Sequence, residues 1–223
     1  MSTPVLILGK SGGGKSYSIR TLPPASTFLL NVIGKELPWR GAAKSYTEMK
    51  DGKGNMFTTD DYKKIDATMS YIDQKRPEIK TIVIDDSQYL LVNEFMRRHS
   101  VSGKGNEVFA LYNDIGDHFW NLIWSSRLLR KDLCVIFLHH SETNDIGEVK
   151  AKSIGKMLDE KVDIPGMFSI CLRVVTEGEE HFFETRNKGN TPAKTPPEMF
   201  ASDHIANDLN IVVEAITKYN KGE

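Results

Sequence analysis

The sequence predicts an α/β fold, in which a mostly parallel sheet is flanked by helices and followed by a small β-rich C-terminal extension. Over the first part of the chain, short apolar runs alternate with longer segments of helical periodicity, which is typical of parallel strands buried on both faces. Beyond residue 142 the pattern changes to shorter strands separated by turns. We expect the 223 residues to form a single domain, with a core over 1–142 and an elaboration over 143–223.

Short apolar runs mark the expected strands. The four parallel strands of the core are expected at 4–8, 27–32, 81–84 and 132–140. Shorter strands of antiparallel type are expected at 148–153, 170–176 and 181–185, with a hairpin turn at 177–180. The segment 34–54 is interrupted by glycine and proline, so it is expected to be a loop with at most one short element.

Helical spacing of apolar residues predicts helices at 59–74, 86–98, 107–130 and 206–219, and a further helix is expected to start within 15–21. The longest of these, 107–130, carries an apolar stripe, and Trp120 and Trp124 lie four residues apart on a neighbouring stripe. We expect the two tryptophans to pack in the core. The alternative is a platform on which nucleic-acid bases stack.

Composition limits the environment and the partners. Lysine and arginine number 29 and aspartate and glutamate 30, so the net charge is −1 and any nucleic acid must be held by a local basic patch. Cys134 and Cys171 are both flanked by apolar residues, which predicts free thiols in a reducing compartment. The apolar runs are too short for a membrane span and no signal peptide is visible. We therefore expect a soluble, cytoplasmic protein without a membrane partner.

The strongest motif is GKSGGGKS at 9–16, which fits G-x-x-x-x-G-K-[ST] and lies between an apolar strand and a helix. Glycines let the backbone turn so that successive N–H groups point into one anion-binding concavity. The lysine can reach the outer phosphates of ATP, and the hydroxyl can hold Mg²⁺. The expected nucleotide-binding residues are Gly9, Lys10, Ser11, Gly12, Gly13, Gly14, Lys15 and Ser16.

Two acids follow the strand at 81–84. Asp85 ends the strand and is expected to hold Mg²⁺ beside the Lys15 loop, usually through water. Asp86 follows directly and has two interpretations, which stay open. It could polarise the attacking water, or it could be a charge at a helix N-terminus stabilised by the helix dipole.

The strand at 134–138 ends in two histidines, His139 and His140. A polar residue at this strand tip could sense the terminal phosphate. Adjacent strand residues point to opposite faces, so we expect one histidine to face the nucleotide and the other to pack. The same geometry argues against a zinc site formed by the pair.

These motifs resemble a known group of proteins. GKSGGGKS, the strand TIVIDD and the tip CVIFLHHSE together are similar to phage-type P-loop ATPases with a RecA-like core. The stretches 153–158, 182–190, 193–196 and 207–209 are similar to small phage ATP-binding proteins, some of which are assigned to single-strand annealing and recombination. The resemblance implies a Mg²⁺-dependent ATPase that binds single-stranded DNA as a ring or filament, in the host cytoplasm.

The sequence departs from the RecA-like pattern at one point. Such proteins carry a catalytic glutamate at the end of the strand after the P-loop helix, whereas 28–33 contains no acid and Glu36 lies three residues further on. The residue that activates water stays open among Asp86, Glu36 and Glu142. Asp86 is the first choice.

Basic residues in the C-terminal part are the candidates for DNA and for a neighbouring active site. The resemblance implies that loops after the histidine strand line a DNA channel, and that Arg186, Lys188 and Lys194 reach the terminal phosphate on the next subunit. The DNA-binding candidates are Lys150, Lys152, Lys156, Lys188 and Lys194. The alternative is a solvated face, because acidic residues interleave with the first of these lysines.

Other P-loop proteins share the nucleotide motif. A helicase loader or a packaging motor would differ only in the C-terminal half. A small-molecule or nucleotide kinase is disfavoured, because no arginine-rich lid segment is visible.

Overall fold

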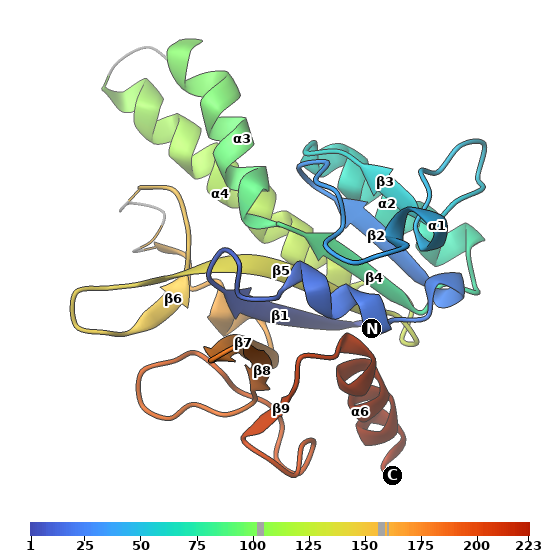
Figure 1. The fold of residues 1–223 in the computed structure, drawn as a ribbon. Helices are drawn as coiled ribbons and strands as arrows, with labels where there is room; N and C mark the ends of the chain where they lie inside the picture. Colours follow the sequence, from blue (N-terminus) through green and yellow to red (C-terminus); the bar gives the residue numbers. More distant parts are fainter. Residues whose placement is uncertain (102–104, 156–158, 160) are drawn as a thin grey trace.

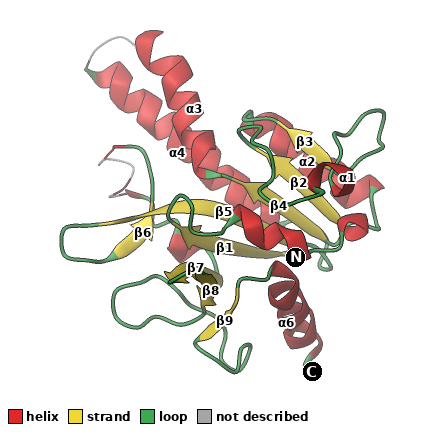
Figure 2. Cartoon of the chain, viewed as in Figure 1, coloured by secondary structure: helices red, strands yellow, loops and turns green. Residues whose placement is uncertain are grey.

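A computed structural model describes residues 1–101, 105–155, 159 and 161–223, and within these residues helices cover both faces of a nine-stranded sheet (Figures 1 and 2). The strand order is β3-β2-β4-β5-β1-β7-β8-β9, and β6 pairs with β5. The strands are β1 (Thr3–Gly9), β2 (Thr27–Asn31), β3 (Met56–Thr58), β4 (Thr81–Asp85), β5 (Cys134–Thr143), β6 (Val149–Ala151), β7 (Ile170–Glu177), β8 (Glu180–Glu184) and β9 (His204–Ala206).

The strand directions confirm a mostly parallel sheet. Each neighbouring pair along the path from β3 to β7 is parallel. The pairs β7–β8, β8–β9 and β5–β6 are antiparallel. Parallel neighbours send their carboxyl ends to the same edge of the sheet, and this edge positions the site described below.

The core lies in two layers because alternate residues of each strand face opposite sides. Leu6, Phe28 and Ile82 pack with residues of α2, α3 and α4, whereas Val5, Leu29 and Val83 pack with residues of the 3₁₀ segment after β1 and of α6. The helices are α1 (Ala42–Ser45), α2 (Tyr62–Lys75), α3 (Gln88–Arg98), α4 (Asn106–Arg127) and α6 (Leu209–Lys221), and 3₁₀ helices span Ser16–Thr21, Pro24–Ser26, His99–Val101 and Pro165–Met167.

The strand β7 differs from its prediction. The sequence predicts a strand of antiparallel type, but β7 pairs in parallel with β1, with Val5 opposite Ile170, and only its other edge is antiparallel. Its first residues are buried like those of β1, so the sequence ICLRVV is that of an inner strand. The strands β3 and β9 are not predicted by any pattern in the sequence, because each is only three residues long.

The prediction that Trp120 and Trp124 pack in the core is wrong. Their exposed fractions are 41% and 46%, and their rings stack on each other with centroids 5.5 Å apart. The buried stripe of α4 includes Leu111, Ile115 and Phe119, and Trp120 lies one residue, about 100°, further round the helix. The stacked pair therefore faces solvent, and its use as a base-stacking platform stays a prediction.

The structure also bears on two expectations from composition, which concern the cysteines and membrane-spanning segments. Cys134 and Cys171 are buried free thiols, as predicted, and burial raises the pKa of each to about 12. Among the described residues, no helix combines the length and the apolar character needed to cross a membrane.

Candidate nucleotide-binding site

The predicted nucleotide residues meet at the carboxyl edge of the sheet. Gly9 ends β1 and lies opposite His140 of β5, and β4, which ends at Asp85, is the next strand beyond β5. A cavity of about 340 Å³ opens at this edge. Its lining comes from the glycine-rich loop (Ser11, Gly12, Gly14, Lys15, Ser16, Tyr17), the segment after β2 (Lys35, Glu36, Pro38), the ends of β4 and β5 (Asp85, Asp86, His140) and His181 of β8.

The loop after β1 turns sharply with the help of its glycines. Gly12 and Gly14 have φ angles of +76° and +97°, a region that L side chains rarely adopt. Gly13 donates its N–H to the Lys10 carbonyl at 3.2 Å, which closes the turn. The helix expected after this loop is a 3₁₀ helix of six residues, so its array of aligned peptide dipoles is short.

Lys15 is buried beneath this loop. Its Nζ donates to the carbonyls of Gly9 at 2.9 Å and Lys10 at 3.0 Å. Burial lowers its pKa to about 8, although the nearby charges of Asp86 and Asp85 oppose the shift. The two carbonyls are neutral acceptors. A bound phosphate would offer the Lys15 ammonium a negatively charged acceptor and therefore a stronger hydrogen bond.

Ser16 and Asp85, the two residues expected to hold Mg²⁺, lie within hydrogen-bond distance of each other. The Ser16 hydroxyl donates to Asp85 Oδ1 at 2.8 Å, and the carboxylate is buried. Burial, together with the charge of Asp86, raises the Asp85 pKa to about 6. A hydroxyl and a carboxylate supply the hard oxygen ligands that Mg²⁺ prefers, and a cation there would favour the ionised form of Asp85. The pair therefore fits Mg²⁺.

The described residues contain no group of three or more histidine, cysteine or acidic side chains that could hold a metal on their own. Mg²⁺ usually completes its shell with water and substrate phosphates. The two side-chain oxygens of the pair are consistent with that mode of binding.

Asp86 is held by two donors. Its Oδ1 accepts from His140 Nε2 and its Oδ2 from Lys35 Nζ, both at 3.0 Å. Burial alone would raise the Asp86 pKa, but these two hydrogen bonds outweigh burial and hold the pKa at about 2. The backbone of Asp86 has a φ of +60°, a left-handed conformation that turns the chain out of β4. Asp86 is thus an ionised carboxylate with both oxygens engaged.

The two histidines separate as strand alternation predicts. His140 lines the cavity. His139 is fully buried, where its Nδ1 accepts from the Ser87 hydroxyl at 3.0 Å and its Nε2 donates to the Lys152 carbonyl at 2.9 Å. Burial lowers the His139 pKa to about 3, so the ring is neutral. His139 is a core residue and His140 is the histidine that faces the cavity.

The other two candidate acids lie in different places. Glu36 lines the cavity, and among the described residues its carboxylate has no hydrogen-bond or ion-pair partner. Glu142 lies two residues beyond His140 on β5, where it forms an ion pair with Lys150 at 3.3 Å. Glu142 does not line the cavity.

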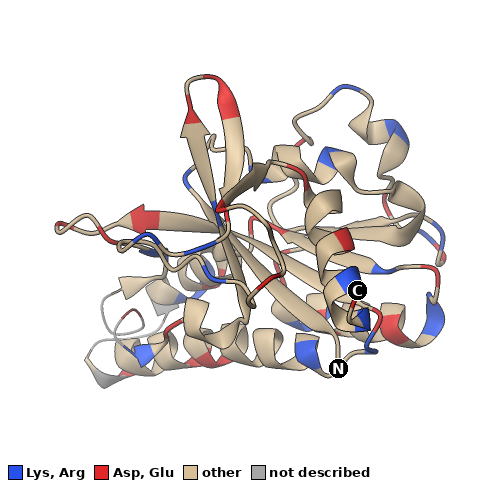
Figure 3. Cartoon of the chain, turned by 90° about the horizontal axis from the view of Figure 1, so that it is seen from below, with Lys and Arg blue, Asp and Glu red and all other residues tan. Residues whose placement is uncertain are grey.

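The basic residues after β5 are only partly available to DNA. Lys150 is ion-paired with both Glu142 and Asp159, whereas Lys152 is exposed. Lys156 lies outside the described residues. Figure 3 shows acidic and basic residues interspersed, without a continuous basic stripe across the described residues on that side.

The candidates for a neighbouring active site lie on the β8 side of the sheet. Arg186 pairs with Asp203 at 3.1 Å and donates to the Phe200 carbonyl. Lys188 Nζ lies 3.4 Å from a nitrogen of His204. Lys194 is exposed, and its backbone pairs with that of Cys171. None of these three basic side chains lines the cavity of its own chain.

Lys35 and His181 are cavity residues that the sequence analysis missed. Lys35 follows Gly34 in the segment after β2, where the available signal was its place beyond the carboxyl end of a predicted parallel strand. His181 lies on β8, and a Cβ added to Gly14 would be 3.0 Å from its ring. Only the three-dimensional pairing of β7 with β1 brings His181 to the phosphate loop.

A glycine-rich phosphate loop, a buried lysine, and a serine paired with a strand-end aspartate define a P-loop nucleotide-binding protein. The family model described as AAA domain matches residues 2–196, so the chain belongs to this ATPase family. The family implies nucleotide binding and hydrolysis, usually with Mg²⁺. A comparison with curated proteins finds no match.

Proposed function

We propose that the protein is a Mg²⁺-dependent ATPase that acts in phage DNA recombination or single-strand annealing, binding single-stranded DNA as an oligomer. The observation that carries the ATPase part is the convergence of Lys15, Ser16 and Asp85 on one cavity at the carboxyl edge of the sheet. The DNA part rests on the resemblance of the sequence to phage annealing and recombination ATPases.

The residues of the cavity suggest a division of work. Lys15 and the loop N–H groups would bind the phosphates, and Ser16 and Asp85 would hold Mg²⁺. When bound, the ion would neutralise charge on the phosphate oxygens. His140 faces the same cavity and donates to Asp86, so it is placed to respond to the terminal phosphate.

Glu36 is a better candidate than Asp86 for orienting the attacking water. A water-orienting acid needs a lone pair open to water and enough basicity to take up the water proton, and the Asp86 pKa of about 2 makes that carboxylate a weak base. Both oxygens of Asp86 are engaged by His140 and Lys35, whereas the Glu36 carboxylate lines the cavity without a partner among the described residues. We therefore propose that Glu36 orients the attacking water and that Asp86 holds Lys35 and His140 in position.

Glu36→Gln and Asp86→Asn test this assignment. Glu36→Gln should lower ATP turnover by about 10²-fold or more while ATP binding persists, because the amide can still accept a hydrogen bond from water but cannot take up its proton. Asp86→Asn should retain more turnover than Glu36→Gln. The reverse order of the two variants would return the role to Asp86.

DNA coupling is proposed for an assembly rather than for a single chain. The net charge is −1 and Lys150 is neutralised by acids, so one chain offers only a modest patch that includes Lys152. A ring or filament repeats such a patch along one strand of DNA, which raises the overall affinity without new contacts. Arg186 would have to leave Asp203 to reach a neighbouring site, whereas Lys194 is already exposed.

The deciding experiment measures ATP hydrolysis with and without single-stranded DNA at low and high salt. Lys15→Ala is the blank, and Lys44→Ala, an exposed lysine of α1 outside the cavity, is the matched control. We expect stimulation by DNA that weakens with salt, because phosphate contacts release counterions. Turnover that survives Lys15→Ala would contradict the ATPase site. Firm ATP binding without stimulation by DNA would contradict the DNA part and favour a protein partner.

A further inference from the structure

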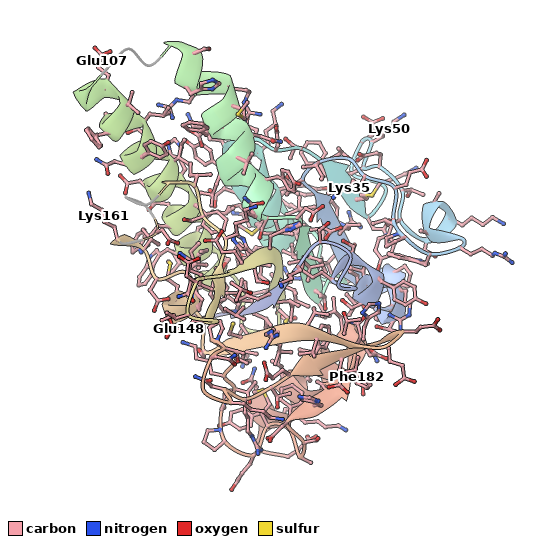
Figure 4. The ribbon with its side chains drawn as sticks, turned by 60° about the vertical axis from the view of Figure 1, so that its left-hand side comes forward. Lys35, Lys50, Glu107, Glu148, Lys161 and Phe182 are labelled. Atoms are coloured by element: carbon pink, nitrogen blue, oxygen red, sulfur yellow. The ribbon has the colours of Figure 1, made fainter. Side chains whose placement is uncertain are left out.

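The side chain of Lys35 lies at the edge of the cavity, and its ammonium group lies beside the carboxylate of Asp86. Its Nζ lies 3.0 Å from Asp86 Oδ2, while 57% of the side chain is exposed, against 6% for Asp86. The same Nζ lies 5.6 Å from the centre of the Tyr89 ring. Figure 4 marks Lys35 beside β2, in the segment that leaves this strand.

The hydrogen bonds leave donors available on this lysine. An ammonium group carries three N–H donors, and the structure engages one of them with Asp86. The other oxygen of Asp86 accepts from His140, so the carboxylate holds both groups in fixed positions. Burial would lower the Lys35 pKa, but the hydrogen bond and charge of Asp86 outweigh burial and raise it, so Lys35 stays charged.

The positive charges of Lys35 and Lys15 lie close enough to influence each other. Burial is the main reason why the Lys15 pKa is low, and the positive charge of Lys35 lowers it further. Both lysines line the cavity together with Ser16. Two ammonium groups around one small cavity are suited to a polyanion such as the triphosphate of ATP.

We propose that Lys35 is a catalytic residue that contacts the terminal phosphate of bound ATP and is held in place for this contact by Asp86. This inference rests on the proposed ATPase function and extends it. The same chain would thereby supply a cation to the transferring phosphoryl group, in addition to any cation from a neighbouring subunit. Such a cation stabilises charge that spreads over the phosphoryl oxygens in the transition state.

In the proposed hydrolysis step, Lys35 stabilises charge but neither gains nor loses a proton. The water oxygen forms a bond to the γ-phosphorus, and the bond from this phosphorus to the β,γ-bridging oxygen breaks. The electron pair of the broken bond stays on ADP. The proton lost by water passes through the free carboxylate of Glu36 to solvent, and the products are ADP and inorganic phosphate. Lys35 keeps its proton throughout.

The test uses Lys35→Ala and Lys35→Arg, with Lys44→Ala as the matched control. Calorimetry measures the affinity of each full-length protein for a non-hydrolysable ATP analogue and for ADP, with Mg²⁺ present. We expect Lys35→Ala to weaken the analogue about tenfold and ADP less than about twofold, because only the analogue carries a terminal phosphate. Turnover should fall by about 10²–10³-fold, the usual range for removing one transition-state donor. Lys35→Arg should recover part of both losses.

A purely structural role for Lys35 would give a different pattern. If Lys35 only kept Asp86 in place, Lys35→Ala would weaken the analogue and ADP equally, and that result would overturn the proposal. Unchanged affinity for the analogue would also overturn it. Absence of hydrolysis in the native protein would instead refute the proposed ATPase function, and the ratio of the two affinities would still decide whether Lys35 contacts the terminal phosphate.

Discussion

Replacing His139 with glutamine should make folding stability less sensitive to mild acid. His139 is fully buried, and burial lowers its pKa to about 3, whereas an unfolded histidine titrates at 6.5. Below pH 6.5 the unfolded chain takes up a proton that the folded chain refuses, so stability is lost as the pH falls. Above pH 6.5 the ring is neutral in both states and contributes no pH dependence.

The expected magnitude follows from the distance between the pH and the unfolded pKa. One pH unit corresponds to about 1.4 kcal/mol, so near pH 5 the contribution of His139 is a loss of about 2 kcal/mol. Asp85 acts in the opposite direction. Burial raises its pKa to about 6, so the folded state gains stability as the pH falls from 6 towards 4. The effect of His139 is therefore visible only as a difference between the native protein and the variant.

Urea unfolding near pH 7.5 and near pH 5, followed by tryptophan fluorescence, measures this difference. Glutamine can still donate to the Lys152 carbonyl, which is the hydrogen bond that His139 Nε2 makes. Between the two pH values, His139→Gln should lose about 2 kcal/mol less than the native protein. His99→Gln, at an exposed position after α3, is the matched control and should follow the native protein. If native protein and His139→Gln lose the same stability within about 0.5 kcal/mol, His139 is not a buried neutral histidine.

Three further predictions concern the phosphate loop and the C-terminal end of α2. Gly14→Ala should lower ATP affinity more than Gly12→Ala, since both glycines have positive φ but only Gly14 lies against His181; equal losses in calorimetry would exclude that contact as the cause. ATP affinity should be constant between about pH 7 and pH 8 and should fall by up to about tenfold per unit above pH 8, as Lys15 loses its proton; a constant affinity up to about pH 9.5 would contradict the low Lys15 pKa. Arg130→Met should destabilise the fold by about 2–3 kcal/mol in urea, because the guanidinium donates to the carbonyls of Ile72 and Arg76 where α2 ends; a loss below about 0.5 kcal/mol would contradict that role.

Much of the fold was predictable because its signals are local. Each parallel strand of the predicted core is a continuous apolar run, and the glycine-rich loop is a contiguous motif. Strand alternation alone predicted that His139 and His140 would point to opposite faces, but not which of them would face the cavity. Arg130, by contrast, caps carbonyls at the end of α2, more than fifty residues away in sequence, which no local signal indicates.

The features that could not be predicted depend on neighbours distant in sequence. The tryptophans of α4 are apolar residues next to an apolar stripe, and only the packing of the helix shows that they face solvent. The ion pair between Lys35 and Asp86 joins residues 51 positions apart. In sequence Asp86 is simply an acid after a strand, and nothing local indicates that both of its oxygens are engaged.

The C-terminal part of the chain contributes directly to the nucleotide site. The strand β7 covers one edge of β1, and a Cβ on Gly9 would be 3.0 Å from Val174 of β7. The strand β8 then brings the His181 ring against Gly14 and into the lining of the cavity. A change in the position of the β7–β8 hairpin would therefore displace the backbone at Gly9 and Gly14, which belongs to the loop that would hold the phosphates. If DNA or a second subunit binds the C-terminal part, this contact gives it a short physical connection to the phosphate loop.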